Sequence, residues 1–423
     1  MQNIINNFKK ICEIPHCSFD TKQMQEFLIN YAKDKGFIVN VDKTGNIHCI
    51  KGNPKICLQS HYDMVCMGDA PKIDLIEEKN IIKAKNSSLG ADNGIGISIM
   101  MSAMDNFENL ECLFTNDEEV GLIGANNLEH KIKSKKLLNL DHESDDEVII
   151  GCAGGVDIHA SINFEKEEGY GDIYELKAIN FKGGHSGINI IDNVKNSIKE
   201  MAKFIKINNG KIIHFEGGER INSIPKYAKA LVSFDTKPEN SENIICEFKE
   251  KNNFKFCKQS EKILSCINSF AQGVRAYSKK MNIVQTSINL ALLKMQEDKI
   301  YIDLFARANF LDDLENIEFQ TYSHFKNYGF NVSSSNFYPP WECNENDFSK
   351  EVFDVLKKEN QNAKMTAIHA GLECGIIEKK QNILCASIGP NINYPHSINE
   401  YCEIDSIEKI SKVVFEILKN NQS

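Results

Sequence analysis

Short apolar runs in the first third of the chain end directly on acidic or histidine side chains, and this pattern limits the fold more than any other feature of the sequence. The runs and the polar residues that follow them are 56–60 with His61, 111–114 with Asp117-Glu118-Glu119, and 136–140 with Asp141. A helical pattern with a Gly-rich start opens at Asp92, between the first two runs. Buried strands that alternate with helices in this way predict a largely parallel sheet with helices on both faces. In such sheets, ligands gather at the carboxyl ends of the strands.

The acidic triplet Asp117-Glu118-Glu119 places like charges side by side, which is unfavourable unless a cation or a shared proton compensates. An isolated triplet of this kind is more often a solvated loop, because Asp and Glu are mostly exposed. The metal-binding alternative gains weight from matching side chains elsewhere in the chain. Asp117 itself has no assigned role and could be a solvated acid.

A pair of divalent ions needs ligands from several directions and usually one carboxylate that contacts both ions. Histidine and carboxylate donors without thiolates suit Zn²⁺, and also Co²⁺ or Mn²⁺. The candidates, each close to a strand end or to a turn containing Gly or Pro, are His61, Asp92, Glu118, Glu119, Asp141 and His396. We therefore expect two divalent metal ions as cofactors.

The length of 423 residues exceeds that of one ordinary core, so we expect two domains or a domain with an insertion. The middle of the chain reads as alternating, half-exposed strands with a few helices, and the last stretch returns to buried strands and helices. Residues 1–175 and 341–423 are predicted to form one α/β domain with a mostly parallel mixed sheet. Residues 176–340 are predicted to form an inserted α+β domain, with the Pro-Pro step before Trp341 as its exit.

Charge and hydropathy exclude several classes of partner. A net charge of -10 and a pI of about 5.7 argue against nucleic acid or an anionic membrane surface, since both require clustered basic residues. The longest apolar run, 95–104, is too short for a membrane span and is interrupted by Gly and Ser. The N-terminus has no leader pattern, so we expect a cytoplasmic protein. The fourteen cysteines are irregularly spaced without a Cys-x-x-Cys motif, and we expect them to be free and reduced.

Taken together, the motifs resemble those of the cytosolic di-zinc peptidase family, which includes aminoacylase, peptidase T, carnosinase and the aminoacyl-histidine (Xaa-His) dipeptidases. The general motifs are His61-Tyr62-Asp63-Met64-Val65, Leu89-Gly90-Ala91-Asp92-Asn93-Gly94, Asp117-Glu118-Glu119-Val120-Gly121, Asn139-Leu140-Asp141 and Gly183-Gly184-His185-Ser186-Gly187. Three further motifs are most similar to the Xaa-His dipeptidases. They are Gly151-Cys152-Ala153-Gly154-Gly155, His369-Ala370-Gly371-Leu372-Glu373-Cys374-Gly375 and Ser387-Ile388-Gly389-Pro390.

The resemblance implies a role for each metal-site residue. Asp92 would bridge two ions; His61 and Asp141 would complete one ion, and Glu119 and His396 the other. Glu118 would be the general base that takes a proton from water and passes it to the leaving amine. Asp63 would fix the imidazole of His61, because residues two apart on a strand point to the same side.

The resemblance also implies that the inserted domain is a lid that binds a small peptide. His185 would stabilise the oxyanion, and Asn222 and Arg307 would hold the terminal carboxylate of the substrate. Glu373 would line the pocket or contact the substrate amine. Homodimers are compatible with the family, since some relatives complete their site with a residue from a partner subunit.

The expected activity is hydrolysis of dipeptides, with Xaa-His dipeptides as the model substrates. Two alternatives remain open: an amidohydrolase acting on N-acyl amino acids, and a non-catalytic metal-binding homologue. Other hydrolase and nucleotide motifs are absent from the sequence, which has no His-Glu-x-x-His, Gly-x-Ser-x-Gly elbow or P-loop.

Overall fold

The structure, a computed structural model, describes residues 1–279 and 281–422 and divides into two compact units. Unit 1 comprises residues 1–152, 341–367 and 372–423, and unit 2 comprises residues 153–340 and 368–371. The expected boundary at residue 175 therefore differs from the observed one. It falls inside β10 (Lys166–Ala178), a strand that pairs with two other strands of unit 2. Trp341, where the chain returns to unit 1, matches the expected exit.

Unit 1 is built on an eight-stranded sheet. In spatial order its strands are β1 (Ile38–Val41), β2 (Ile47–Lys51), β6 (Leu110–Thr115), β3 (Ile56–His61), β7 (Lys136–Asn139), β21 (Leu384–Ser387), β8 (Glu147–Cys152) and β20 (Lys364–Ile368). The four central strands β6, β3, β7 and β21 are parallel, whereas β1, β2 and β6 pair antiparallel. The mostly parallel mixed sheet predicted from the apolar runs is confirmed.

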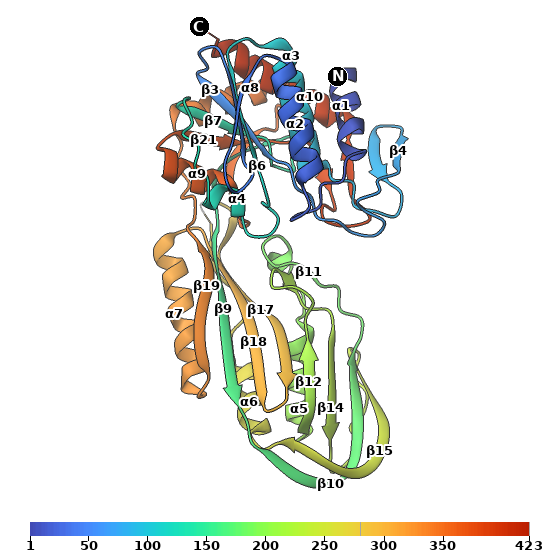
Figure 1. Cartoon of the computed structure of the whole chain (residues 1–423). Coiled ribbons are helices and arrows are strands. Elements are labelled where there is room, and N and C mark those ends of the chain that lie inside the picture. Colours follow the sequence, from blue (N-terminus) through green and yellow to red (C-terminus); the bar gives the residue numbers. More distant parts are fainter. Residues whose placement is uncertain (280, 423) are drawn as a thin grey trace. The chain divides into compact units, whose positions relative to one another are not determined.

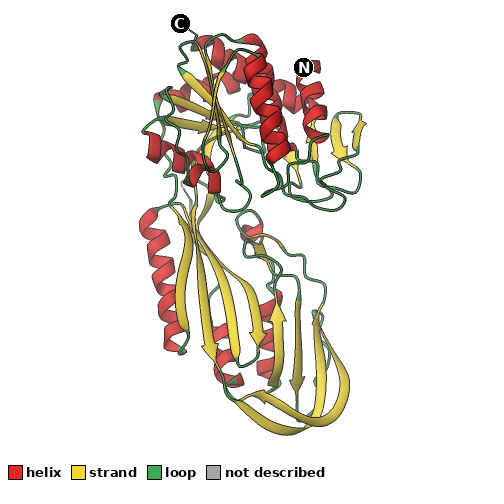
Figure 2. Cartoon of the chain, in the orientation of Figure 1, coloured by secondary structure: helices red, strands yellow, loops and turns green. Residues whose placement is uncertain are grey.

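Helices flank this sheet in Figure 2 and supply much of its core. They are α1 (Gln2–Cys12), α2 (Lys22–Asp34), α3 (Ala91–Asn106), α4 (Ile123–Asn126), α8 (Asp347–Glu359), α9 (Glu373–Gln381) and α10 (Ile404–Asn420). All six residues of β3 and of β6 are buried, as expected for parallel strands covered by helices. A smaller antiparallel sheet contains β22 (Ile392–Asn393), β23 (Tyr401–Glu403), β5 (Ile81–Ala84) and β4 (Leu75–Glu78).

Unit 2 has an antiparallel sheet of nine strands. Their order is β15 (Ile244–Cys257), β10, β14 (Ala228–Ser233), β12 (Lys211–Gly217), β17 (Ile283–Gln296), β18 (Lys299–Ala308), β9 (Gly154–Asn163) and β19 (Asn331–Tyr338), with β16 (Gly273–Ser278) pairing on β17. The helices α5 (Ser197–Ile207), α6 (Ser260–Ser269) and α7 (Leu311–Asn327) share one core with the sheet. A two-stranded ribbon, β11 (Gly184–His185) with β13 (Ser223–Ile224), and a 3₁₀ turn, η1 (Asn189–Asp192), complete the unit. The predicted α+β character is confirmed.

Two local features differ from the sequence patterns. The apolar spacing of residues 260–277 predicts one helix, but α6 ends at Ser269 and the chain turns into β16 at Gly273, whose φ of +96° is a left-handed conformation that a helix does not use. Asp405 is expected to cap the last helix, yet α10 already begins at Ile404 and Asp405 lies in its first turn. Among the described residues, no helix is long and apolar enough to cross a membrane.

Candidate metal centre

The parallel strands of unit 1 deliver the expected ligands to one edge of the sheet. His61 is the last residue of β3, Glu118 and Glu119 follow the end of β6, and Asp141 follows the end of β7. Because β6, β3 and β7 are adjacent and parallel, their carboxyl ends lie side by side. This register explains why side chains far apart in the sequence form one cluster.

Asp92 lies between two histidines that contact its two different oxygens. Its Oδ1 is 3.0 Å from Nε2 of His61, and its Oδ2 is 3.1 Å from Nε2 of His396. Asp92 precedes a cis peptide bond to Asn93 at the start of α3, where its backbone is not helical. A carboxylate that offers one oxygen to each side has the geometry of a bridging ligand.

Two groups of potential metal ligands share Asp92. His61, Asp92 and Asp141 form one group, and Asp92, Glu119 and His396 form the other, with the ligand atoms of each group within 4.8 Å of one another. A third group places Glu118 with His61 and Glu119. The structure thus brings together all five residues predicted as ligands and the predicted base.

The donor set of these groups fits divalent metal ions. Oε1 of Glu119 is buried and lies 2.8 Å from Nε2 of His396, but it makes no hydrogen bond. Nδ1 of His61 lies 3.0 Å from the backbone oxygen of Asp63, to which a proton on Nδ1 can be donated, and Nε2 faces Asp92 and Asp141. Imidazole and carboxylate donors of this kind suit Zn²⁺, Co²⁺ or Mn²⁺.

The buried carboxylates of this site favour positive charge among them, as the directions of three pKa shifts indicate. Burial alone would lower the pKa of His61, but nearby carboxylates, Asp141 foremost, raise it well above its ordinary value. Burial raises the pKa of Asp92, yet hydrogen bonds from His396 and His61 hold it well below its ordinary value. For Glu118, burial and the neighbouring carboxylates raise the pKa well above the ordinary value despite the opposing charge of His61.

Asp63 connects the ligand His61 to the loop of the base. Its Oδ1 accepts a hydrogen bond from the backbone N–H of Glu118 at 2.9 Å, and its Oδ2 accepts one from Glu119 at 3.3 Å. Oδ1 also lies 3.5 Å from Nδ1 of His61. Asp63 therefore contacts three site residues, His61, Glu118 and Glu119.

Sequence reasoning missed Glu400, a buried carboxylate that holds the loop before Asp92. It accepts hydrogen bonds from the backbone N–H groups of Leu89, Gly90 and Ala91 at 2.8, 3.1 and 2.8 Å. Because it lies four residues after His396, it ties together the two loops that carry Asp92 and His396. No local signal reveals this contact, since the partners are more than 300 residues apart.

Glu143 and Asn93 are further residues near the site that sequence reasoning did not single out. Burial and the charge of Asp92 raise the pKa of Glu143 to about 8. The side-chain amide of Asn93 donates a hydrogen bond to Asp141. Each lies within two residues of a predicted ligand, and that proximity was the only available signal.

Glu373 is fully buried in unit 1 at the start of α9. Its Oε2 accepts hydrogen bonds from the side chains of Gln59 and Thr115, both at 2.6 Å, while its Oε1 has no hydrogen-bond partner. Burial raises the pKa of this carboxyl to about 7. Glu373 therefore contacts two strands of the unit 1 sheet, β3 through Gln59 and β6 through Thr115.

Within unit 2, the side chains of His185 and Arg307 lie close together, and Asn222 pairs with Ser186, the residue that follows His185. Nη2 of Arg307 lies 3.5 Å from Nε2 of His185, and the backbone oxygen of Asn222 accepts from the N–H of Ser186. Arg307 is buried, its Nη1 donates to the hydroxyl of Tyr338 at 3.0 Å, and its Nε has no hydrogen-bond partner. A buried guanidinium with an unused donor is suited to bind an anion.

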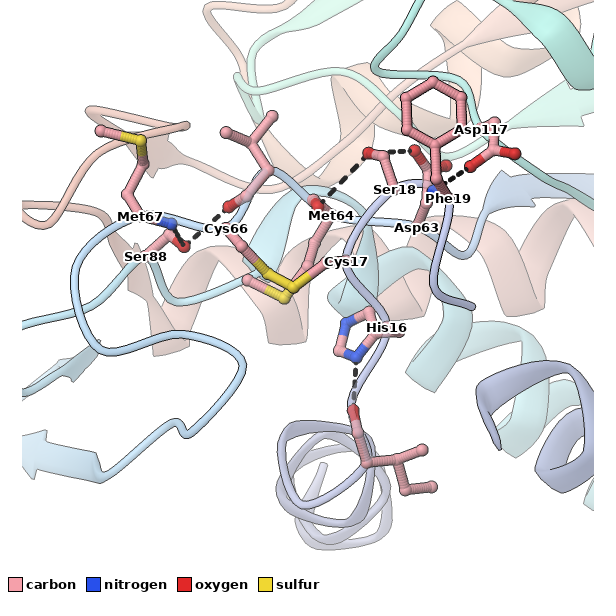
Figure 3. Close-up of a disulfide and its surroundings, with 12 residues drawn as sticks. His16, Cys17, Ser18, Phe19, Asp63, Met64, Cys66, Met67, Ser88 and Asp117 are labelled. Carbon is pink, nitrogen blue, oxygen red and sulfur yellow. Dashed lines mark hydrogen bonds between the residues drawn. A yellow bond between two sulfur atoms is a disulfide. The ribbon is translucent and has the colours of Figure 1, made fainter. Parts of the chain in front are cut away.

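The expectation that all cysteines are free is wrong for one pair. Cys17 and Cys66 form a disulfide with their Cα atoms 5.5 Å apart, next to Asp63 (Figure 3). The two residues are separated by 49 positions, and nothing in their spacing indicates the pairing, which arises because the loop after α1 packs along the loop after β3. The remaining twelve cysteines are not in disulfides.

Comparisons with known proteins agree with this architecture. Residues 57–420 match peptidase family M20/M25/M40. The chain is 29% identical to the cytosol non-specific dipeptidase of Escherichia coli strain K12 over 97% of its own length and 96% of the relative's. Aminoacylhistidine dipeptidase from Vibrio alginolyticus superposes with a TM-score of 0.77 at 26% identity, covering 99% of this chain and 96% of that one. Human carnosine dipeptidase 1, at 11% identity, shares the fold with a TM-score of 0.60 over 100% and 97% of the two chains.

The family match spans most of the chain, and the two more similar relatives are aligned over nearly their whole length. The resemblance to the di-zinc peptidases and to their Xaa-His dipeptidases is thereby confirmed. The chain belongs to peptidase family M20/M25/M40 and is a homologue of its metal-dependent dipeptidases.

Proposed function

We propose that this protein is a cytoplasmic dipeptidase that uses two divalent metal ions, with Xaa-His dipeptides among its substrates. The observation that carries the proposal is the position of Asp92, whose two oxygens face His61 and His396 in two separate ligand groups. Zn²⁺ is the proposed metal, with Co²⁺ or Mn²⁺ as alternatives. The relatives named as cytosol non-specific dipeptidase and aminoacylhistidine dipeptidase support the substrate class and the compartment.

His61, Asp92 and Asp141 would hold one ion, and Asp92, Glu119 and His396 the other. When bound, such a pair of ions supplies Lewis acidity and lowers the pKa of water. Glu118 would accept the proton of the attacking water and return it to the leaving nitrogen, since it lies with His61 and Glu119 in a group of potential ligands. Asp63 would hold His61 and the backbone of Glu118 and Glu119 in their positions relative to one another.

Arg307 and Asn222 of unit 2 would bind the carboxylate at the end of the substrate. The unused Nε donor of the buried Arg307 supports this assignment, because a carboxylate can accept two parallel hydrogen bonds from a guanidinium. His185, 3.5 Å from Arg307, would donate to the oxyanion that develops at the scissile carbonyl. A pocket that recognises a terminal carboxylate limits the length of the peptide.

Glu373 is the proposed contact for the substrate's amino group, through the Oε1 atom that lacks a partner. Glu373→Gln separates this role from a purely structural one, since the amide retains an acceptor for Gln59 and Thr115 but loses the negative charge. Amine recognition predicts a higher KM for dipeptides with a free amino end and an unchanged KM for their N-acetyl forms. An unchanged KM for both would assign Glu373 to support of the fold.

The test of the proposed function is a substrate panel with protein loaded with Zn²⁺, Co²⁺ or Mn²⁺. It contains Xaa-His and other dipeptides, tripeptides and N-acetyl amino acids, and mass spectrometry measures the products. We expect cleavage of dipeptides, with Xaa-His among them, and little cleavage of the rest. Preferential cleavage of N-acetyl amino acids would make the protein an amidohydrolase, and no cleavage would make it a non-catalytic homologue.

A further inference from the structure

The segment of residues 16–19, which follows α1, lies against two loops of the candidate metal centre (Figure 3). The backbone N–H of Met64 donates to the oxygen of His16 at 3.0 Å, and the N–H of Ser18 donates to the oxygen of Met64 at 3.2 Å. The N–H of Phe19 donates to Oδ1 of Asp117 at 2.7 Å. The segment thus spans the loop after β3 and the loop after β6.

Ser18 is the residue of this segment that contacts the positioning carboxylate. Its hydroxyl donates to Oδ2 of Asp63 at 2.8 Å. Oδ2 also accepts from the backbone N–H of Glu119, and Oδ1 accepts from that of Glu118. Ser18 therefore completes the hydrogen bonds of the carboxylate that fixes both glutamates and His61.

The disulfide is placed so that it holds Ser18 in this position. Cys17 directly precedes Ser18, and Cys66 lies three residues after Asp63, so the bond closes a small ring around the Ser18–Asp63 contact. Both cysteines are only half-buried, which leaves the sulfur atoms within reach of a small reductant. In reducing compartments, disulfides are usually transient or redox-sensing.

We propose that Ser18 is a positioning residue for Asp63 and that the Cys17–Cys66 disulfide locks it there, so that the oxidised protein is the more active form. This inference rests on the proposed function. In the reductive step, a dithiol gives up two hydrogens and becomes a disulfide, while the Cys17–Cys66 bond breaks and each sulfur gains one hydrogen. Reduction frees Cys17 from Cys66, so that Ser18 is held only by hydrogen bonds and Asp63 loses part of its restraint.

The first measurement compares dipeptide hydrolysis by oxidised and reduced metal-loaded protein. A phosphine reductant avoids competing thiols, because it breaks the disulfide while taking an oxygen atom from water. We expect kcat to fall about fivefold on reduction, the scale of one weakened hydrogen bond to a charged group, with a smaller change in KM. Mass spectrometry of the oxidised protein must show a peptide pair linked through Cys17 and Cys66. Absence of that linkage, or equal kcat in both states, would overturn the inference.

Variants distinguish an effect of the disulfide on the Ser18–Asp63 contact from a general effect on stability. Ser18→Ala in the oxidised protein should lower kcat about as much as reduction does, and reduction should then have no further effect. The double variant Cys17→Ser/Cys66→Ser should have the kcat of the reduced protein, and the reductant should not change that kcat. Cys343→Ser, at an exposed cysteine outside the disulfide, should retain the full response. If Ser18→Ala still responds fully to reduction, the disulfide does not act through Asp63.

A second measurement does not depend on turnover. Because Asp63 contacts the ligand His61, the affinity for Co²⁺, followed by its visible absorption, should be lower in Cys17→Ser/Cys66→Ser than in the oxidised protein, and lower to a similar degree in Ser18→Ala. Equal affinities in all three would contradict the inference. If the oxidised protein binds Co²⁺ in this manner but cleaves no dipeptide, the proposed function fails and the positioning role of Ser18 stands.

Discussion

Asp92 and His396, 304 positions apart in the chain, meet at 3.1 Å between Oδ2 and Nε2. This contact lies within the group of Asp92, Glu119 and His396. The other oxygen of Asp92 contacts His61, which belongs to the group of His61, Asp92 and Asp141. Removing one oxygen of Asp92 therefore removes a ligand from one group and leaves the other group its oxygen.

Asp92→Asn should lower the bound metal from two ions to about one per chain, because an amide nitrogen cannot replace the second carboxylate oxygen. Elemental analysis after dialysis against metal-free buffer measures this. Asp117→Asn is the matched control, since Asp117 accepts from Phe19 through an oxygen that an amide retains. Two bound ions per chain in Asp92→Asn would show that the two ions do not share Asp92 as a ligand.

Glu118→Gln should bind both metal ions but lose turnover. The change removes the group that carries the proton while preserving its size, and the loss in kcat should be about 10² to 10⁴-fold. Steady-state kinetics together with metal content check both parts. A retained kcat would show that another residue is the base. A loss of metal would show that Glu118 is a ligand.

Arg307→Met should raise KM for dipeptides by at least about tenfold, because a charge-assisted pair with the substrate carboxylate is lost. The same substitution should leave KM for the corresponding dipeptide amides nearly unchanged. Arg275→Met, an exposed arginine of unit 2, serves as control. Equal effects on acids and amides would assign Arg307 a structural role.

His369 makes the stability of the protein depend on pH. Burial, aided by the charge of Arg307, lowers the pKa of His369 from 6.5 to about 3, and its ring is held between Ser287 and Asn309. Between these two values the unfolded state binds more protons than the folded state, so stability is full above pH 6.5 and falls as the pH drops. The loss between pH 6.5 and pH 5 should be about 2 kcal/mol.

Denaturant unfolding at a series of pH values measures this dependence. His369→Gln should flatten the curve between pH 6.5 and pH 5. A curve for His369→Gln that is parallel to that of the unaltered protein would show that His369 does not titrate in this manner.

The sequence predicted the sheet of unit 1 and the clustering of the candidate ligands, because strand ends in a parallel sheet occupy a common edge. His61, Glu119 and Asp141 each come at the end of a buried apolar run, and the end of each run in the sequence is also the end of a strand in the sheet. Roles that depend on long-range contacts were not visible. Glu400 binds a loop more than 300 residues earlier, and Cys17 meets Cys66 only because two loops pack together. The expected boundary at residue 175 and the end of unit 1 at residue 152 differ by a stretch that holds β9 and most of β10, two strands of the unit 2 sheet.

The central claim, hydrolysis of dipeptides at a two-metal site, is tested most directly by titrating metal-free protein with Zn²⁺ while measuring cleavage of a Xaa-His dipeptide. We expect no cleavage without metal and maximal cleavage at two equivalents per chain. Cleavage by the metal-free protein, or an intact dipeptide at two bound equivalents, would contradict it.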